Sequence, residues 1–121
     1  MMGKVNPINY QFNLKKGDTG IPIKMHLYDG DSCTDFSLAG YTVKFYMAPK
    51  NDPTTPKIDG IAGTIVDAAS GVIQYQWQGT DTDTEGVFEF LFKLTNTISG
   101  RTFSVPIISP GIVVIEHTLG S

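Results

Sequence analysis

Hydrophobic and polar side chains alternate along most of this chain, and this period of two constrains the fold more than any other feature. Successive side chains of a β-strand point to opposite faces, so alternation predicts strands that are buried on one face. Four segments would bury the following side chains: Ile21, Ile23, Met25 and Leu27; Tyr41, Val43, Phe45 and Met47; Ile73, Tyr75 and Trp77; Phe88, Phe90, Phe92 and Leu94. Helical spacing is nearly absent. We therefore expect an all-β protein.

Turn-forming residues recur between these segments, at Lys16-Gly17-Asp18, Asp29-Gly30-Asp31, Ser70-Gly71, Glu85-Gly86, Ser99-Gly100 and Pro110-Gly111. Residues 51–56 contain Pro53 and Pro56, and they predict a longer loop at a sheet edge or crossover, because proline supplies no N–H to a sheet. Shorter strands are expected at residues 57–61, 63–67, 101–105 and 112–116.

The spacing of strands and turns predicts an immunoglobulin-like antiparallel β-sandwich of about 7 to 9 strands. A single open sheet with aromatic residues on one face needs a second layer to bury them, and a second sheet provides it. We expect one domain over residues 1–121, with a core of about 9–117 and flexible ends at 1–8 and 118–121.

Composition excludes several classes of function. The net charge of −3 gives no basic footprint for nucleic acid. Apolar stretches such as residues 112–115 are far shorter than the roughly 20 residues of a membrane span, so we expect no membrane insertion. The first seven residues lack the apolar run of a secretory signal. Cys33 is the only cysteine, which rules out an internal disulfide and a site built from several thiolates.

The sequence offers no recognisable catalytic constellation. His26 and His117 are the only histidines, they lie on distant segments, and the position of His26 on a polar strand face favours a solvated side chain. Neither a nucleophile elbow nor a glycine-rich phosphate loop occurs. We therefore predict a protein that is not an enzyme, with no catalytic residues and no cofactor.

Two acidic segments resemble calcium loops in composition only. In the register of an EF-hand, the segment that begins at Asp29 places Gly40 where the bidentate glutamate belongs. The segment 81–86 leads to Phe92 at the same position, in the middle of a predicted core strand. We therefore interpret both as solvated turns and predict no metal site.

Tyr28 and Tyr46 are the best candidates for exposed contact residues, because the alternation places both on outward strand faces. Exposed tyrosines occur on most protein surfaces, and this ordinary explanation is favoured. The alternative is a platform for sugars or for a partner protein.

Five segments taken in order resemble the N-terminal immunoglobulin-like domain of phage baseplate upper proteins and related tail baseplate proteins: 14–23 (LKKGDTGIPI), 38–47 (LAGYTVKFYM), 70–77 (SGVIQYQW), 81–82 with 85–90 (DT and EGVFEF), and 100–106 (GRTFSVP). The resemblance covers most of the chain. It concerns this domain alone, and not the longer arm that such a domain attaches to the tail.

The resemblance implies a non-enzymatic virion structural protein that serves as an attachment and assembly module of a phage tail baseplate. Its partners would be other tail and baseplate proteins and further copies of itself, and it would assemble in the host cytoplasm before residing in the virion. The alternative is a carbohydrate-binding module that recognises host cell-wall polysaccharide.

Overall fold

The computed structural model describes residues 5–6, 11–29, 34–105 and 111–117, with side chains for 11–27, 36–105 and 111–117. Within these ranges the structure contains strands and no helix, which confirms the all-β prediction. The strands are β1 (Val5–Asn6), β2 (Gln11–Lys15), β3 (Ile23–His26), β4 (Tyr28–Asp29), β5 (Thr34–Asp35), β6 (Tyr41–Pro49), β7 (Ile58–Ala62), β8 (Thr64–Asp67), β9 (Val72–Tyr75), β10 (Gly86–Asn96), β11 (Thr102–Val105) and β12 (Gly111–Glu116).

The larger sheet has six strands in the order β2-β12-β10-β6-β7, with β11 beside β10. β10 is central: its first half pairs with β12, its second half with β11, and β6 follows it along nearly its whole length. β2 runs parallel to β12, whereas the other strand pairs of the described residues are antiparallel. Among the described strands, this edge is the one departure from the predicted antiparallel arrangement.

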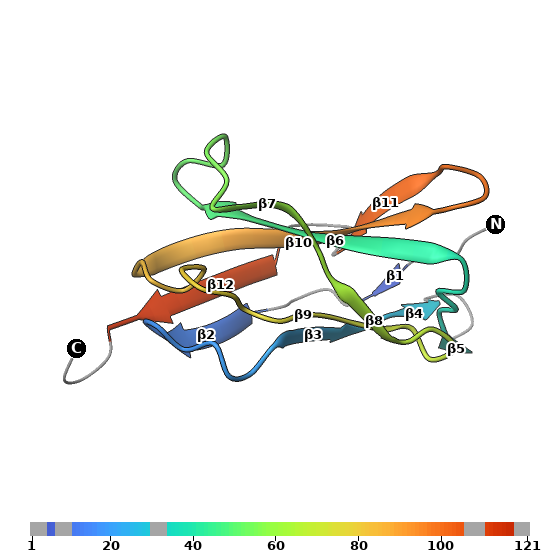
Figure 1. The fold of residues 1–121 in the computed structure, drawn as a ribbon, viewed down its shortest axis with the longest axis horizontal. Coiled ribbons are helices and arrows are strands. Elements are labelled where there is room, and N and C mark those ends of the chain that lie inside the picture. The colour runs from blue at the N-terminus through green and yellow to red at the C-terminus, as the bar shows by residue number, and fades with distance from the viewer. Residues whose placement is uncertain (1–4, 7–10, 30–33, 106–110, 118–121) are drawn as a thin grey trace.

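A three-stranded sheet in the order β3-β9-β8 forms the second layer (Figure 1). β1, β4 and β5 add a small third sheet, in which each strand has two residues. The nine strands of the two main sheets confirm the predicted β-sandwich. The order β12-β10-β6-β7 corresponds to strands G, F, C and C′ of an immunoglobulin domain, and β3-β9-β8 corresponds to B, E and D.

The core between the two sheets is built around Phe45 of β6. Its ring stacks on Tyr75, with centroids 4.5 Å apart and planes inclined by 9°. It also contacts Trp77 at 5.8 Å, Phe90 at 5.7 Å and Phe92 at 4.9 Å between ring centroids. Each aromatic ring buries roughly 150–250 Å². Because Tyr75 comes from the smaller sheet, this cluster joins the two layers.

The structure departs from the sequence pattern at strand ends. The alternation places Ile21 in the core, but its side chain is 79% exposed, because β3 begins only at Ile23 and the preceding Pro22 has no N–H to donate. Trp77 is buried as predicted, although β9 ends at Tyr75. β2 was not predicted, although Phe12 and Leu14 alternate with polar residues along it.

The predicted shorter strands are confirmed as β7, β8, β11 and β12, and residues 51–56 form the predicted loop before the edge strand β7. Val5–Asn6 of the predicted flexible N-terminal end form β1 beside β4. The other residues of the predicted ends, Cys33 and most of the predicted turn at 29–31 lie outside the described residues.

Gly71 occupies the turn before β9 and cannot be replaced without strain. Its φ angle is +74°, and an added Cβ would lie 2.7 Å from the carbonyl oxygen of Leu27 and closer still to that of Phe36. The N–H of Leu27 donates to the carbonyl of Gly71 at 2.8 Å, and the N–H of Phe36 donates to the carbonyl of Leu27 at 3.0 Å. Three chain segments therefore meet at this glycine.

Candidate functional site

The candidate site lies on the outward face of the larger sheet, where side chains alternate with those of the core. Leu91 of β10 stands opposite Tyr46 of β6, and Glu89 stands opposite Ala48. All four residues are half-buried. Lys93 follows on the same face of β10. This face therefore has an apolar middle with charged groups on both sides of it.

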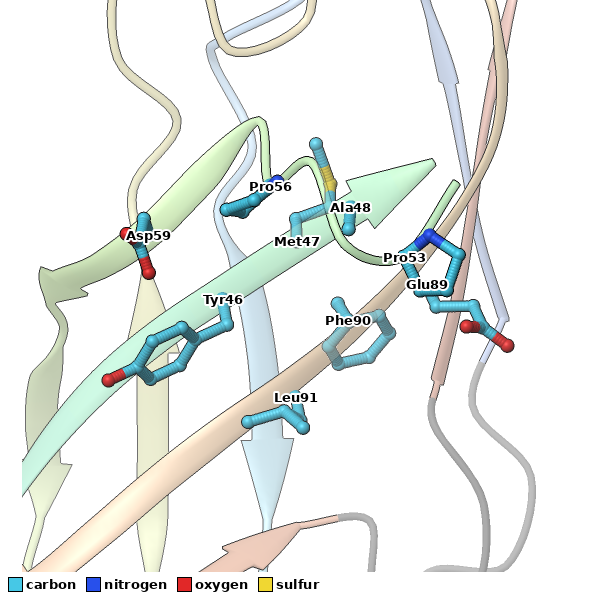
Figure 2. A pocket seen from close by; sticks show the side chains of 9 residues that line it. All are labelled: Tyr46, Met47, Ala48, Pro53, Pro56, Asp59, Glu89, Phe90 and Leu91. Carbon is cyan, nitrogen blue, oxygen red and sulfur yellow. The ribbon is translucent and has the colours of Figure 1, made fainter. Parts of the chain in front are cut away.

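A hollow of about 290 Å³ opens on this face (Figure 2). Its outward-facing lining comes from Tyr46, Ala48, Asp59, Glu89 and Leu91, and Pro53 and Pro56 of the β6–β7 loop border it. Strands of the larger sheet thus supply one part of the wall and a loop supplies the other.

Backbone hydrogen bonds fix the loop that borders the hollow. At its start, the N–H of Lys50 donates to the carbonyl of Val87 at 2.9 Å. At its end, the N–H of Lys57 donates to the carbonyl of Met47 at 2.8 Å. The prolines at positions 53 and 56 restrict φ between these two anchors. The loop is therefore anchored at both ends and holds its two prolines beside the hollow.

Tyr46 lies on the outward face, as the alternation predicts, but it is half-buried. The Nζ of Lys93 lies 5.0 Å from its ring centroid, and its hydroxyl end packs so closely on Gly60 that an added Cβ would lie 2.9 Å from the hydroxyl oxygen. The backbone of Tyr28 pairs with Asn6 and Asp35 in the small third sheet, and its side chain lies outside the described residues. The fold places these two tyrosines in different sheets.

The two carboxylates of the hollow, Glu89 and Asp59, have no ion pair or side-chain hydrogen bond among the described residues. Glu89 is half-buried between Ala48 and Ile112, which stand opposite it on the two neighbouring strands. Two carboxylates without a partner attract an approaching cation. The hollow therefore favours an apolar group that carries a positive charge.

The acidic segment 81–86 uses its carboxylates within the protein. The Tyr75 hydroxyl donates to Asp81 at 2.6 Å, and the N–H of Gln78 donates to the same oxygen at 2.9 Å. Burial, together with the hydrogen bond to Asp81, raises the pKa of Tyr75 well above its ordinary value. Lys57 donates to Asp83 at 2.7 Å and lowers the pKa of Asp83. These internal bonds agree with the interpretation of this segment as a structural turn.

Among the described residues, no group of three His, Cys, Asp or Glu side chains is placed to hold a metal ion. The other acidic segment, 29–35, lies outside the described side chains. His26 is half-buried on β3 of the smaller sheet, and His117 is exposed after β12 of the larger sheet. The Nδ1 atom of His117 lies 3.5 Å from Glu85, a pairing that the sequence did not indicate.

Sequence reasoning identified Tyr46 but missed the other residues that line the hollow. Leu91 carried a detectable signal, because Phe90, Leu91 and Phe92 are three consecutive apolar residues in an alternating strand. One of the three had to face outward. The contribution of Pro53 and Pro56 depends on how the loop folds back, which no local pattern indicates.

A scan against protein-family models found no match, and a search of curated proteins found no similar sequence. Among the described residues there is no helix of sufficient length and hydrophobicity to cross a membrane.

Proposed function

We propose that this chain is a non-enzymatic structural protein of a phage virion, an attachment and assembly module of the tail baseplate. It works by presenting rigid surfaces to neighbouring tail and baseplate subunits, and it assembles with them in the host cytoplasm. The observation that carries the proposal is the apolar hollow with two unpaired carboxylates on the outward face of the larger sheet. A surface fixed on paired strands loses little conformational entropy when a partner binds.

The resemblance to baseplate domains supports the same role. The resembling segments include all of β9 and β11 and most of β6, together with parts of β2, β3 and β10. They are therefore distributed over both main sheets of the sandwich and are not confined to one loop. In a virion the module would act in several copies, where linkage raises the effective concentration and weak single contacts suffice.

Co-expression with the tail proteins encoded beside this chain tests the proposal. We expect a complex that survives affinity purification and size-exclusion chromatography. Leu91→Asp places a charge in the hollow and should weaken that complex by tenfold or more. Val66→Asp is the matched control, because Val66 is an exposed apolar residue on β8 of the other sheet. Absence of any association with the neighbouring tail proteins would contradict the proposal.

A second candidate is a carbohydrate-binding module for host cell-wall polysaccharide, which one observation favours. The hollow combines the Tyr46 ring with the carboxylates of Asp59 and Glu89. An aromatic ring can contact the apolar face of a sugar, and carboxylates can accept hydrogen bonds from its hydroxyl groups. Lys93 and Gly60 already contact that ring, so the assembly role is the stronger of the two. Binding of purified cell-wall polysaccharide by the isolated domain, lost in Tyr46→Ala, would reverse this order.

A further inference from the structure

The β10–β11 hairpin exposes an apolar side chain at its tip. Ile98 is 92% exposed, more than any other large hydrophobic side chain of the described residues. The Oδ1 atom of Asn96 accepts hydrogen bonds from the N–H of Ile98 at 2.9 Å and from the N–H of Ser99 at 3.1 Å. The N–H of Gly100 donates to the carbonyl of Asn96 at 2.8 Å. The tip therefore holds Ile98 in solvent by a defined hydrogen-bonded turn.

The hairpin tip is also tied to the body of the domain. Both the N–H and the hydroxyl of Thr97 donate to the carbonyl of Gly40, at 2.8 Å and 2.9 Å. The N–H of Asn96 donates to the carbonyl of Arg101 at 2.8 Å. Such a tip can anchor a contact at low entropic cost, because its backbone is already ordered before a partner binds.

The tip and the hollow are complementary in chemistry. The exposed Arg101 stands three residues after Ile98 and has no ion pair among the described residues. The hollow offers apolar walls together with the unpaired carboxylates of Glu89 and Asp59. Its volume of about 290 Å³ is about twice that of the roughly 150 Å³ cavity that admits benzene in an engineered protein core. A branched aliphatic side chain fits such a space.

The tip of one molecule cannot fill its own hollow. Leu91 borders the hollow, and Asn96 lies five residues further along the extended strand β10, which at about 3.3 Å per residue separates them by roughly 16 Å. The hairpin and the β6–β7 loop rise on the same side of the larger sheet (Figure 1). The tip is therefore accessible to another molecule that faces this side.

We propose that the hollow on the larger sheet binds the hairpin tip of a second copy of this chain, with Ile98 inserted into the hollow and Arg101 against Glu89 and Asp59. This inference rests on the assembly role proposed above: association of copies through the hollow would raise the effective concentration at which the module meets neighbouring tail proteins. Opposite charges at the rim set the orientation of the contact, and the buried apolar anchor stabilises it.

Sedimentation velocity of the purified full chain tests the proposal. We expect the sedimentation coefficient to rise with concentration up to about 1 mM. Ile98→Ser should weaken self-association by tenfold or more, as removal of an interface anchor does. Ile21→Ser is the matched control, because Ile21 is also largely exposed but lies just before β3. Both variants should retain the strand-type circular dichroism of the parent, since each changes an exposed side chain.

A charge exchange tests the orientation of the contact. Arg101→Glu should weaken self-association, and the double variant Arg101→Glu with Glu89→Arg should restore it. A chain that stays monomeric throughout this concentration range, or an Ile98→Ser variant that associates like the parent, overturns the proposal. If the chain is monomeric but binds neighbouring tail proteins, self-association is refuted and the assembly role stands. If the chain self-associates but binds none of those proteins, the assembly role is refuted and self-association stands.

Discussion

Replacement of Gly71 by alanine should destabilise the domain far more than the loss of a glycine in an ordinary turn. At φ +74°, alanine adopts the left-handed conformation at a cost of about 1 to 2 kcal/mol. The added Cβ would also press on the carbonyl oxygens of Leu27 and Phe36. Both obstacles are backbone atoms, so no change of rotamer relieves them, and overpacking of this kind costs about 1 to 3 kcal/mol.

The hydrogen bond between Leu27 and Gly71 would be strained as well, which adds about 1 kcal/mol. Together these contributions predict a loss of about 3 to 6 kcal/mol. A domain of this size has a total stability of about 5 to 15 kcal/mol, so the variant should lie at the margin of folding.

Gly17→Ala is the matched control for this prediction. Gly17 also has a positive φ, +88°, but nothing lies within 4 Å of an added Cβ. It should therefore show only the conformational cost, about 1 to 2 kcal/mol. Urea unfolding followed by tryptophan fluorescence measures both values. If the two variants differ by less than about 1 kcal/mol, the steric reasoning at Gly71 is wrong.

Two further predictions concern the core and its pH dependence. Phe90→Ala removes a ring that contacts Phe45 and packs on Gly111. It should lower the free energy of unfolding in urea by about 3 to 5 kcal/mol. Val87 lies on the same strand and its side chain is 44% exposed, so Val87→Ala should cost less than about 1 kcal/mol. Tyr75→Phe removes a hydrogen bond to a carboxylate and should cost about 1.5 to 3 kcal/mol. Burial and Asp81 raise the pKa of Tyr75, so the folded state holds this proton more tightly than the unfolded state. The stabilisation should therefore be complete below about pH 10 and decline above it. The decline in stability should be smaller in the Tyr75→Phe variant. If the parent and the variant lose stability equally at alkaline pH, this reasoning is wrong.

The period-two pattern was sufficient to predict the strands that carry the core. Apart from the half-buried Tyr41, β6, β9 and β10 bury the side chains that the alternation selects, because the face to which a side chain points depends only on its place in its own strand. The same rule placed Tyr46 on the outward face. It failed for Ile21, where the sequence does not show how far the strand extends.

Strand pairing could not be predicted in the same way. β2 joins the larger sheet by parallel pairing with β12, and each residue of β2 pairs with one about one hundred positions later in the chain. Hydrogen bonding between strands depends on which backbones meet, and alternation within a strand carries no information about its neighbour. The parallel edge is therefore not predictable from alternation, although Phe12 and Leu14 do alternate with polar residues along β2 itself.

By itself, then, the sequence determined the all-β class, the β-sandwich and the division of each main strand into a buried and an outward face. Only the tertiary structure decided what stands on that outward face. The hollow exists because Pro53 and Pro56 fold back beside Tyr46 and Leu91, residues that are separated in the chain and brought together by the pairing of β6 with β10. Side-chain direction is a local property of an extended backbone, whereas a concave surface requires distant segments to meet.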